Sequence, residues 1–333
     1  MRIRPRYAVA GTVAVLLVGV AAACSQLPKM GAGGLLHPGR RTTLATRPAA
    51  CEDAAFANDG VTLRGWRCGS RTPPRGTIVY LHGIADNRSS AAGVIERYAA
   101  RGFQVIAYDS RAHGQSTGDA CTYGVFEKRD LQKVLDAVGP GRIVLIGTSL
   151  GAAVALQAAA EDPRITTVVA AETFSDLRTV ATERAPFIFT RGSIDRAFAL
   201  AEQQGGFSVD AASPVASASR IKIPVLLIHG DADHETPPDH SRRVFDALAG
   251  PKRLVLVPGA GHNGSLRGPD VWQEIDHWIE SWKPAAGSRK LEAGSWKPEA
   301  GSWKPAADYR SRNASRGNAN LPAAASMTLI WQV

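Results

Sequence analysis

Six short apolar runs, separated by longer stretches that suit helices, constrain the fold of this chain more than any other feature. The runs are rich in β-branched residues and almost continuously hydrophobic, which is typical of strands buried on both faces. Because parallel strands require crossover connections, the alternation predicts an α/β fold with a mostly parallel sheet and helices on both faces. The runs are residues 76–83, 102–110, 142–149, 165–172, 223–230 and 253–260, and the helix candidates are 91–101, 127–138, 150–161, 240–249 and 271–282.

Residues 174–221 interrupt this rhythm with mixed polar and aromatic content. Ligands of open α/β sheets bind at the carboxyl ends of the strands, in loops that extend beyond the sheet. We therefore expect these residues to form a small lid over that edge and to supply a wall of a substrate pocket.

A serine flanked by glycines occupies the junction between one predicted strand and the helix that follows it. Gly147, Ser149 and Gly151 form a G-x-S-x-G motif directly after the run RIVLI and before an Ala-rich stretch. A sharp strand-to-helix turn strains the backbone at the serine, and glycines on either side remove the Cβ clashes that the turn would create. The context predicts a nucleophile elbow with Ser149 as the nucleophile.

A serine hydroxyl needs a base and an acid that orients this base. His262 lies in the small-residue loop GAGHNG, just after the last strand candidate, and can return over the elbow as the base. The loop after the preceding strand offers two acids, Asp231 and Asp233. The order serine, acid, histidine is typical of one large class of α/β enzymes.

From about residue 60 to residue 282 the chain resembles the α/β-hydrolase superfamily, in its serine aminopeptidase-like or Bem46-like branch. In that branch the acid follows H-G-x-x-D-x-x-V-P, and His229, Gly230 and Pro237 set the register here, although Thr236 replaces the usual Val. The resemblance implies the α/β-hydrolase fold and identifies the acid as Asp233.

The resemblance also implies an oxyanion hole made of two backbone N–H groups, those of Leu150 and Ile84. Asp231 is then expected to form a hydrogen bond within its turn, and His82 to hold loop backbone rather than to act as a base. The acidic and histidine residues between positions 231 and 240 follow no zinc or calcium spacing, so neither a metal nor a cofactor is expected.

The N-terminus resembles an export signal. Basic residues precede an apolar run that ends at residue 23, and we expect residues 1–23 to be excluded from the fold. Cys24 follows three alanines that resemble an imperfect bacterial lipobox, which favours an exported lipoprotein with Cys24 lipidated; a soluble exported protein and a retained signal anchor stay as alternatives. Either attachment predicts a periplasmic or cell-envelope location and contact with the membrane.

Residues 24–50 are rich in Gly, Pro, Arg and Ala, which predicts a flexible tether that leads to a hydrolase domain over residues 51–283. Cys51 and Cys68 flank a hairpin-like segment and are the candidates for a disulfide in an oxidising compartment. Cys121 has no obvious base beside it and is expected to be a small buried residue.

After residue 282 the sequence repeats in seven-residue steps such as SWKPAAG and SWKPEAG. Recurrent proline excludes a coiled coil, and we expect residues 284–333 to be a disordered tail, with a tryptophan-repeat binding module as the alternative. The tail and the first six residues contribute net charges of +5 and +3 to a total of +9, so the remainder is almost neutral and no nucleic-acid partner is expected.

The sequence therefore predicts a cofactor-free serine hydrolase that acts on a small-molecule carboxylic ester or related acyl compound through an acyl-enzyme. A peptidase, an aminopeptidase or a thioesterase would use the same residues, because specificity resides in the lid. A surface lipoprotein that keeps the fold only for binding is the non-enzymatic alternative. Nothing in the sequence selects a substrate or an oligomeric state.

Overall fold

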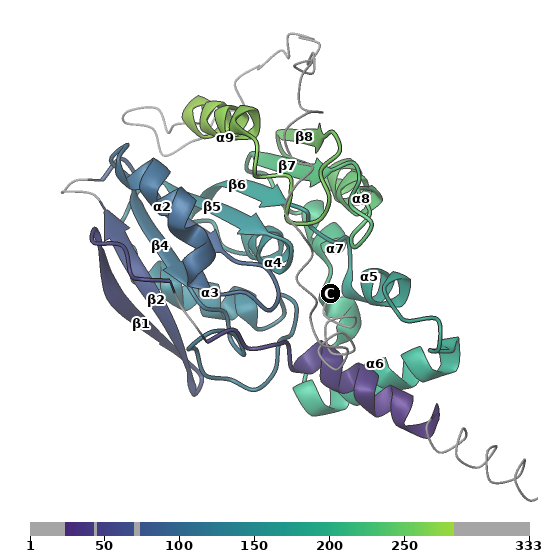
Figure 1. The fold of residues 1–333 in the computed structure, drawn as a ribbon. Coiled ribbons are helices and arrows are strands. Elements are labelled where there is room, and N and C mark those ends of the chain that lie inside the picture. The colour runs from purple at the N-terminus through teal and green to yellow at the C-terminus, as the bar shows by residue number, and fades with distance from the viewer. Residues whose placement is uncertain (1–23, 43–44, 70–73, 283–333) are drawn as a thin grey trace, which may run out of the picture.

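The computed structural model describes residues 24–42, 45–69 and 74–282, and an eight-stranded sheet lies at the centre of this part of the chain (Figure 1). The strand order is β1-β2-β4-β3-β5-β6-β7-β8. β2 pairs antiparallel with β1 and β4, and all other neighbours are parallel, which confirms the predicted mostly parallel sheet. The strands are β1 (Cys51–Asn58), β2 (Val61–Gly69), β3 (Thr77–Leu81), β4 (Gln104–Tyr108), β5 (Ile143–Thr148), β6 (Ile165–Ala171), β7 (Val225–Gly230) and β8 (Lys252–Val257).

Helices cover both faces of the sheet, because successive side chains of each central strand point to opposite sides. In β3, Val79 and Leu81 join the apolar cluster under α3, α4, α7 and α8, whereas Ile78 and Tyr80 join the cluster under α2 and α9. The helices are η1 (Arg88–Ala91), α2 (Ala92–Ala99), α3 (Glu127–Asp136), α4 (Leu150–Ala159), α5 (Leu177–Glu183), α6 (Arg191–Gly205), η2 (Val209–Ala211), α7 (Pro214–Ala218), α8 (Asp239–Ala247) and α9 (Pro269–Ser281).

The predicted lid region, residues 174–221, contains α5, α6, η2 and α7. Figure 1 shows α5 and α6 beyond the edge of the sheet, where a lid was expected. α7 differs, because it packs against α4 and α8 and helps to cover one face of the sheet. The part that projects from the core is therefore shorter than the sequence predicted.

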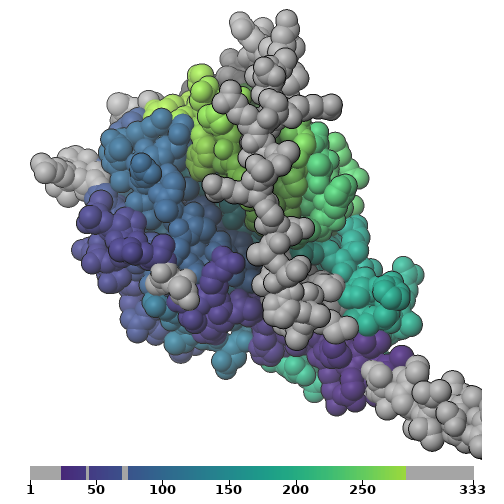
Figure 2. Space-filling view, in the orientation of Figure 1, coloured from purple at the N-terminus to yellow at the C-terminus, as the bar shows by residue number. Residues whose placement is uncertain are grey.

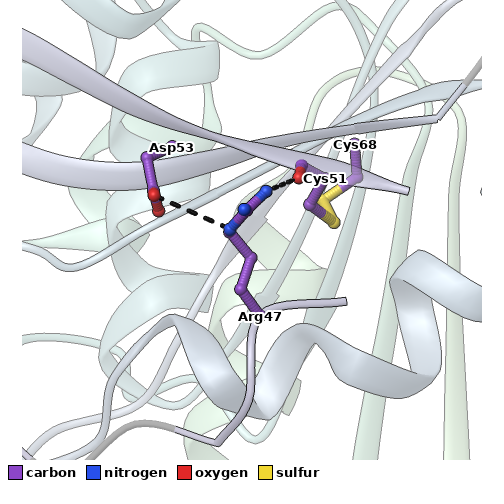
Figure 3. The surroundings of a disulfide bond; sticks show 4 residues. All are labelled: Arg47, Cys51, Asp53 and Cys68. Atoms are coloured by element: carbon purple, nitrogen blue, oxygen red, sulfur yellow. Dashed lines mark hydrogen bonds and ion pairs between the residues drawn. A yellow bond between two sulfur atoms is a disulfide. The ribbon is translucent and has the colours of Figure 1, made fainter. Parts of the chain in front are cut away.

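The antiparallel hairpin β1–β2 carries a disulfide between Cys51 and Cys68, which are direct cross-strand partners with Cα atoms 3.9 Å apart (Figure 3). The hairpin turns at Asp59 and Gly60, both with positive φ as a two-residue type I′ turn requires. Figure 3 also shows Arg47, which donates a hydrogen bond to the carbonyl oxygen of Cys51. The bridge thus joins the open end of the hairpin at the edge of the sheet.

The prediction of a flexible tether over residues 24–50 is wrong for its first part, because residues 24–36 form a helix. Leu35 and Leu36 are at most 1% exposed and belong to the main apolar core. The hydroxyl of Tyr123 and the N–H of Cys121 donate hydrogen bonds to the carbonyl oxygens of these two leucines, at 3.0 and 2.8 Å. Proline and three glycines give the segment low intrinsic helix propensity, so the helix depends on this tertiary packing.

The predicted export signal, residues 1–23, and the predicted tail, residues 284–333, lie outside the described residues. Among the helices that the structure does describe, none has the length and hydrophobicity needed to cross a bilayer.

A buried N-terminal helix predicts a measurable contribution to stability. Leu35→Ala should lower the free energy of unfolding by about 2–5 kcal/mol, because it leaves a cavity in the core. Met30→Ala, on the same helix but with Met30 53% exposed, should change it by no more than about 0.5 kcal/mol. Urea unfolding of both variants provides the comparison, and equal stabilities would show that the helix does not pack as described.

Candidate active site

Ser149 lies at the turn between β5 and α4 with φ 49° and ψ −114°, a conformation that costs energy for any residue with a side chain. The turn is possible only because two neighbours lack a Cβ atom. A Cβ on Gly147 would come within 2.4 Å of the carbonyl oxygen of Gly151, and one on Gly151 within 2.1 Å of that of Leu81. The G-x-S-x-G spacing therefore has the structural role that the sequence predicted for it.

The structure brings the three predicted polar residues together. His262 Nδ1 lies 2.7 Å from Asp233 Oδ2, and His262 Nε2 lies 3.2 Å from Ser149 Oγ. A carboxylate can only accept, so Nδ1 carries the proton of the neutral ring and Nε2 presents its lone pair to the serine hydroxyl. This is the arrangement in which a histidine can remove the proton of a serine.

Asp233 is almost fully buried, and hydrogen bonds compensate its charge. Its Oδ1 accepts from the N–H groups of Glu235 and Thr236, both at 2.9 Å, and His229 Nε2 lies 3.2 Å from its Oδ2. Burial by itself would raise the pKa of Asp233, but the bonds from His229, His262 and Thr236 hold this pKa well below its usual value. The acid next to His262 therefore stays ionised across the physiological range.

Asp231, the other candidate acid, points elsewhere. Its Oδ1 accepts a hydrogen bond of 2.7 Å from the N–H of Gly259, in the loop that follows β8. The sequence predicted a bond within the residue's own turn, so the partner differs, although the role in holding backbone is the same. The loop that Asp231 holds leads to His262.

Two opposing effects act on His262. Burial of the ring lowers its pKa, while the hydrogen bond and negative charge of Asp233, with smaller contributions from Glu172 and Glu235, raise it. The effects of the acidic residues outweigh the effect of burial, so the pKa of His262 lies above its ordinary value. Its neutral form, which is the form that can accept a proton, is favoured at higher pH.

The sequence reasoning missed Glu172, which immediately follows β6 and is 2% exposed. Its carboxylate accepts hydrogen bonds from three successive N–H groups, those of Asn263, Gly264 and Ser265, at 2.7, 3.1 and 2.9 Å. These donors directly follow His262 and fix its loop. The available signal was a charged residue at the carboxyl end of an apolar strand run, ITTVVAAE, which a buried strand rarely tolerates without partners.

A cavity of about 650 Å³ opens beside Ser149 and His262. Ile84 lies in its wall next to Gly83, and a Cβ on Gly83 would be 3.6 Å from the Cβ of Ser149. Leu150 is the first residue of α4. The two residues predicted to supply oxyanion N–H groups thus belong to the loop after β3 and to the start of α4, on either side of the serine.

The wall of this cavity carries charges of both signs. Arg184 lies 3.3 Å from Glu235 and Arg41 lies 3.5 Å from Asp86, so each arginine pairs with an acid of the same wall. Apolar side chains, among them Ile84, Val94 and Trp272, line the rest of the wall.

The other histidines near the elbow hold backbone, as predicted for His82. His82 Nε2 accepts from the N–H of Ser110 at 3.0 Å, so its Nδ1–H donates to the carbonyl oxygen of Gly83 at 2.7 Å. Burial lowers the pKa of His82, in keeping with a neutral structural ring.

The two cysteines outside the disulfide differ in their surroundings. Cys121 is buried, and burial raises the pKa of its thiol, whereas Cys24 is exposed and unpaired.

No group of three or more His, Cys, Asp or Glu side chains within residues 24–282, as far as these are described, is arranged to hold a metal ion.

Two family models match the chain. Residues 76–191 match the α/β-hydrolase fold and residues 204–284 match the TAP-like protein family. Together the two segments contain Ser149, Asp233 and His262.

Relatives and solved structures agree with these matches. The uncharacterized protein YfhR of Escherichia coli is 32% identical over 254 residues, which cover 71% of this chain and 84% of YfhR. The esterase Pf2001 of Pyrococcus furiosus superposes with a TM-score of 0.61 at 22% identity, over 73% of this chain and 99% of the esterase. Acetyl xylan esterase 1 of Thermoanaerobacterium gives 0.57 at 18% identity, over 78% and 94% of the two chains. By its matched families, its relatives and its fold, the chain belongs to the α/β-hydrolase superfamily.

Proposed function

We propose that this α/β-hydrolase cleaves a carboxylic ester or a related acyl bond with Ser149 as nucleophile, His262 as general base and Asp233 as the acid that orients the histidine. The observation that carries the proposal is the continuous chain of contacts at the cavity, 3.2 Å from Ser149 Oγ to His262 Nε2 and 2.7 Å from His262 Nδ1 to Asp233 Oδ2. The register of His229, Gly230 and Pro237 around Asp233 supports the Bem46-like branch in particular.

The proposed reaction follows from this geometry. His262 Nε2 accepts the proton of Ser149 as the oxygen attacks the acyl carbon, and Asp233 stabilises the imidazolium that forms. The same proton then passes to the leaving alkoxide, which departs as an alcohol and leaves an acyl-serine. His262 next takes a proton from a water molecule, whose oxygen attacks the acyl carbon. The bond from this carbon to Ser149 Oγ breaks as His262 returns the proton to Oγ, and the carboxylic acid is released.

The negative charge on the substrate oxygen requires donors that are already in place. We assign this role to the N–H groups of Leu150 and Ile84, because the start of α4 and the loop after β3 flank Ser149. The positive end of the α4 dipole adds to the stabilisation.

We also propose that the protein is exported and attached to the membrane by its N-terminus, either through lipid on Cys24 or through the apolar run that ends at residue 23. Two observations support this location: the disulfide between Cys51 and Cys68, which is stable in oxidising compartments, and the exposure of Cys24.

The first test is labelling of the full chain by a fluorophosphonate probe, together with turnover of a panel of acyl esters. Ser149→Ala should lower turnover by about 10⁶ with an unchanged melting temperature, because the nucleophile is lost and core packing is kept. Ser90→Ala is the matched control: Ser90 lines the same cavity but donates to the carbonyl oxygen of Asn87. Ser149→Ala with a tenth of the original turnover would exclude the assignment.

The second test separates the two acids. Asp233→Asn should cost about 10⁴ in turnover, because the amide no longer fixes the productive tautomer of His262. Asp231→Asn should weaken only the bond to Gly259, on the order of 1 kcal/mol of stability, with little change in turnover. Both variants are measured on one ester, and the reverse ranking would move the acid two residues upstream.

The third test concerns pH. Turnover requires neutral His262, so kcat/KM should fall as the pH drops through the raised pKa of His262. Glu172→Gln removes a nearby negative charge and should move this acid limb to lower pH; it should also lower kcat, because an amide has one acceptor oxygen for the three N–H donors. Glu235→Gln is the control, since Glu235 also raises the pKa of His262 but holds no backbone of the histidine loop. Glu235→Gln should shift the acid limb of the pH profile less than Glu172→Gln does, and it should leave kcat unchanged. If the two variants changed the pH profile and kcat identically, a positioning role for Glu172 would be contradicted.

A further inference from the structure

Three large apolar side chains are exposed within the described residues: Phe187 at 98%, Met30 at 53% and Ile188 at 42%. Phe187 and Ile188 are adjacent, in the loop between α5 and α6. The N–H of Phe189 bonds to the carbonyl oxygen of Pro186 at 2.9 Å, so the loop is a closed turn with Phe187 and Ile188 at its tip. Scattered exposed apolar residues are common, but two neighbours held outward by a closed turn form an apolar tip.

In Figure 1 the loop between α5 and α6 and the outer end of the helix of residues 24–36 lie on the same side of the molecule. The helix of residues 24–36 contacts α6 at the C-terminal ends of both helices, where a Cβ on Gly205 would come within 2.8 Å of Leu36 Cδ2. The first described residues of the N-terminal helix and the start of α6 both lie on the right in Figure 1, and the two helices run from there toward this contact. In Figure 2 the N-terminal residues, in purple, border the teal atoms of the α6 region at the lower right.

The packed helix determines how far the domain can move from an N-terminal attachment. A flexible tether of residues 24–50 would let the domain drift away from the membrane. Leu35 and Leu36 are instead buried in the core, so no free residues separate Cys24 from the folded domain. Whether lipid is bound to Cys24 or the apolar run before it enters the bilayer, residue 24 lies at the membrane surface.

Exposed charges near this end favour an anionic lipid surface. Lys29 on the N-terminal helix and Arg191 and Arg196 on the first turns of α6 are exposed, and Asp195 is the exposed acid on these two segments. Glu183, before the turn, is also exposed, but it is paired with His240 and Arg243. The N-terminal helix itself contains no acidic residue. Basic side chains around an apolar tip are typical of proteins that rest on anionic membranes.

We propose that the turn of residues 186–189 inserts Phe187 and Ile188 into the surface of the lipid bilayer to which the N-terminus attaches the chain. The inference rests on the proposed N-terminal attachment and goes beyond it, because it assigns a defined face of the hydrolase domain to the membrane. The α5–α6 region next to the cavity would then face the lipid, with Arg184 of the cavity wall only three residues before Phe187.

The test uses the full chain with Cys24→Ser, so that residues 1–23 remain as the attachment and a thiol label enters at one new position. Cys121 is buried and Cys51 and Cys68 are bridged, so they do not react. An environment-sensitive nitrobenzoxadiazole label is placed at Phe187→Cys, and the matched control is Ala57→Cys, an exposed position on β1 at the opposite side of the sheet in Figure 1. Both proteins are reconstituted with vesicles of phosphatidylcholine and phosphatidylglycerol.

The label at 187 should emit at shorter wavelength than the label at 57, be quenched several times more strongly by nitroxide lipid, and be shielded from aqueous iodide. Flotation of the vesicles tests attachment separately. A chain that floats with the vesicles while both labels are equally open to iodide, or equally shielded from it, would overturn the docking proposal and leave the attachment standing. If neither this chain nor the chain with native Cys24, produced in a bacterium that lipidates exported proteins, floats with the vesicles, both proposals are overturned.

Discussion

The close approach of β3, β5 and α4 around Ser149 is the constraint on which the rest of the site depends. Leu81, at the end of β3, lies so near to α4 that only a residue without a side chain fits at position 151, and Gly147 meets the same helix from β5. This contact forces the strained backbone of Ser149 and directs its hydroxyl out of the sheet. It also places the loop after β3, which contains Gly83 and Ile84, directly beside Ser149.

The remaining polar groups reach Ser149 because parallel strands end at one edge. Glu172 follows β6, Asp233 follows β7 and His262 follows β8, so three consecutive neighbours in the sheet each contribute one group. Their roles differ in kind. Asp233 sets the tautomer and charge of the imidazole, whereas Glu172 holds the backbone of the histidine loop through three N–H groups.

The sequence was sufficient where local pattern and tertiary structure agree. The central strands β3 to β7 are largely buried and appear as continuous apolar runs, β8 at the edge of the sheet is half-buried, and the elbow has a spacing that sterics dictate. The sequence was insufficient for elements whose structure depends on contacts with residues far away along the chain. Residues 24–36 are rich in glycine and contain a proline, so their composition predicted a flexible tether instead of the observed helix. The sequence of α7 did not distinguish it from the lid, because its position is defined only by its packing against α4. Glu172 could not be assigned, because its partners lie about ninety positions further along the chain.

The packing of the N-terminal helix has a consequence for the order in which this protein can fold. Leu36 and Gly205, which touch in the native state, are separated by 169 positions. As the chain emerges from a ribosome or a translocation pore, the first helix therefore has to wait for most of the domain before its apolar face can be covered. Until then Leu27, Leu35 and Leu36 stay exposed, and a nascent chain of this kind depends on chaperones to avoid aggregation.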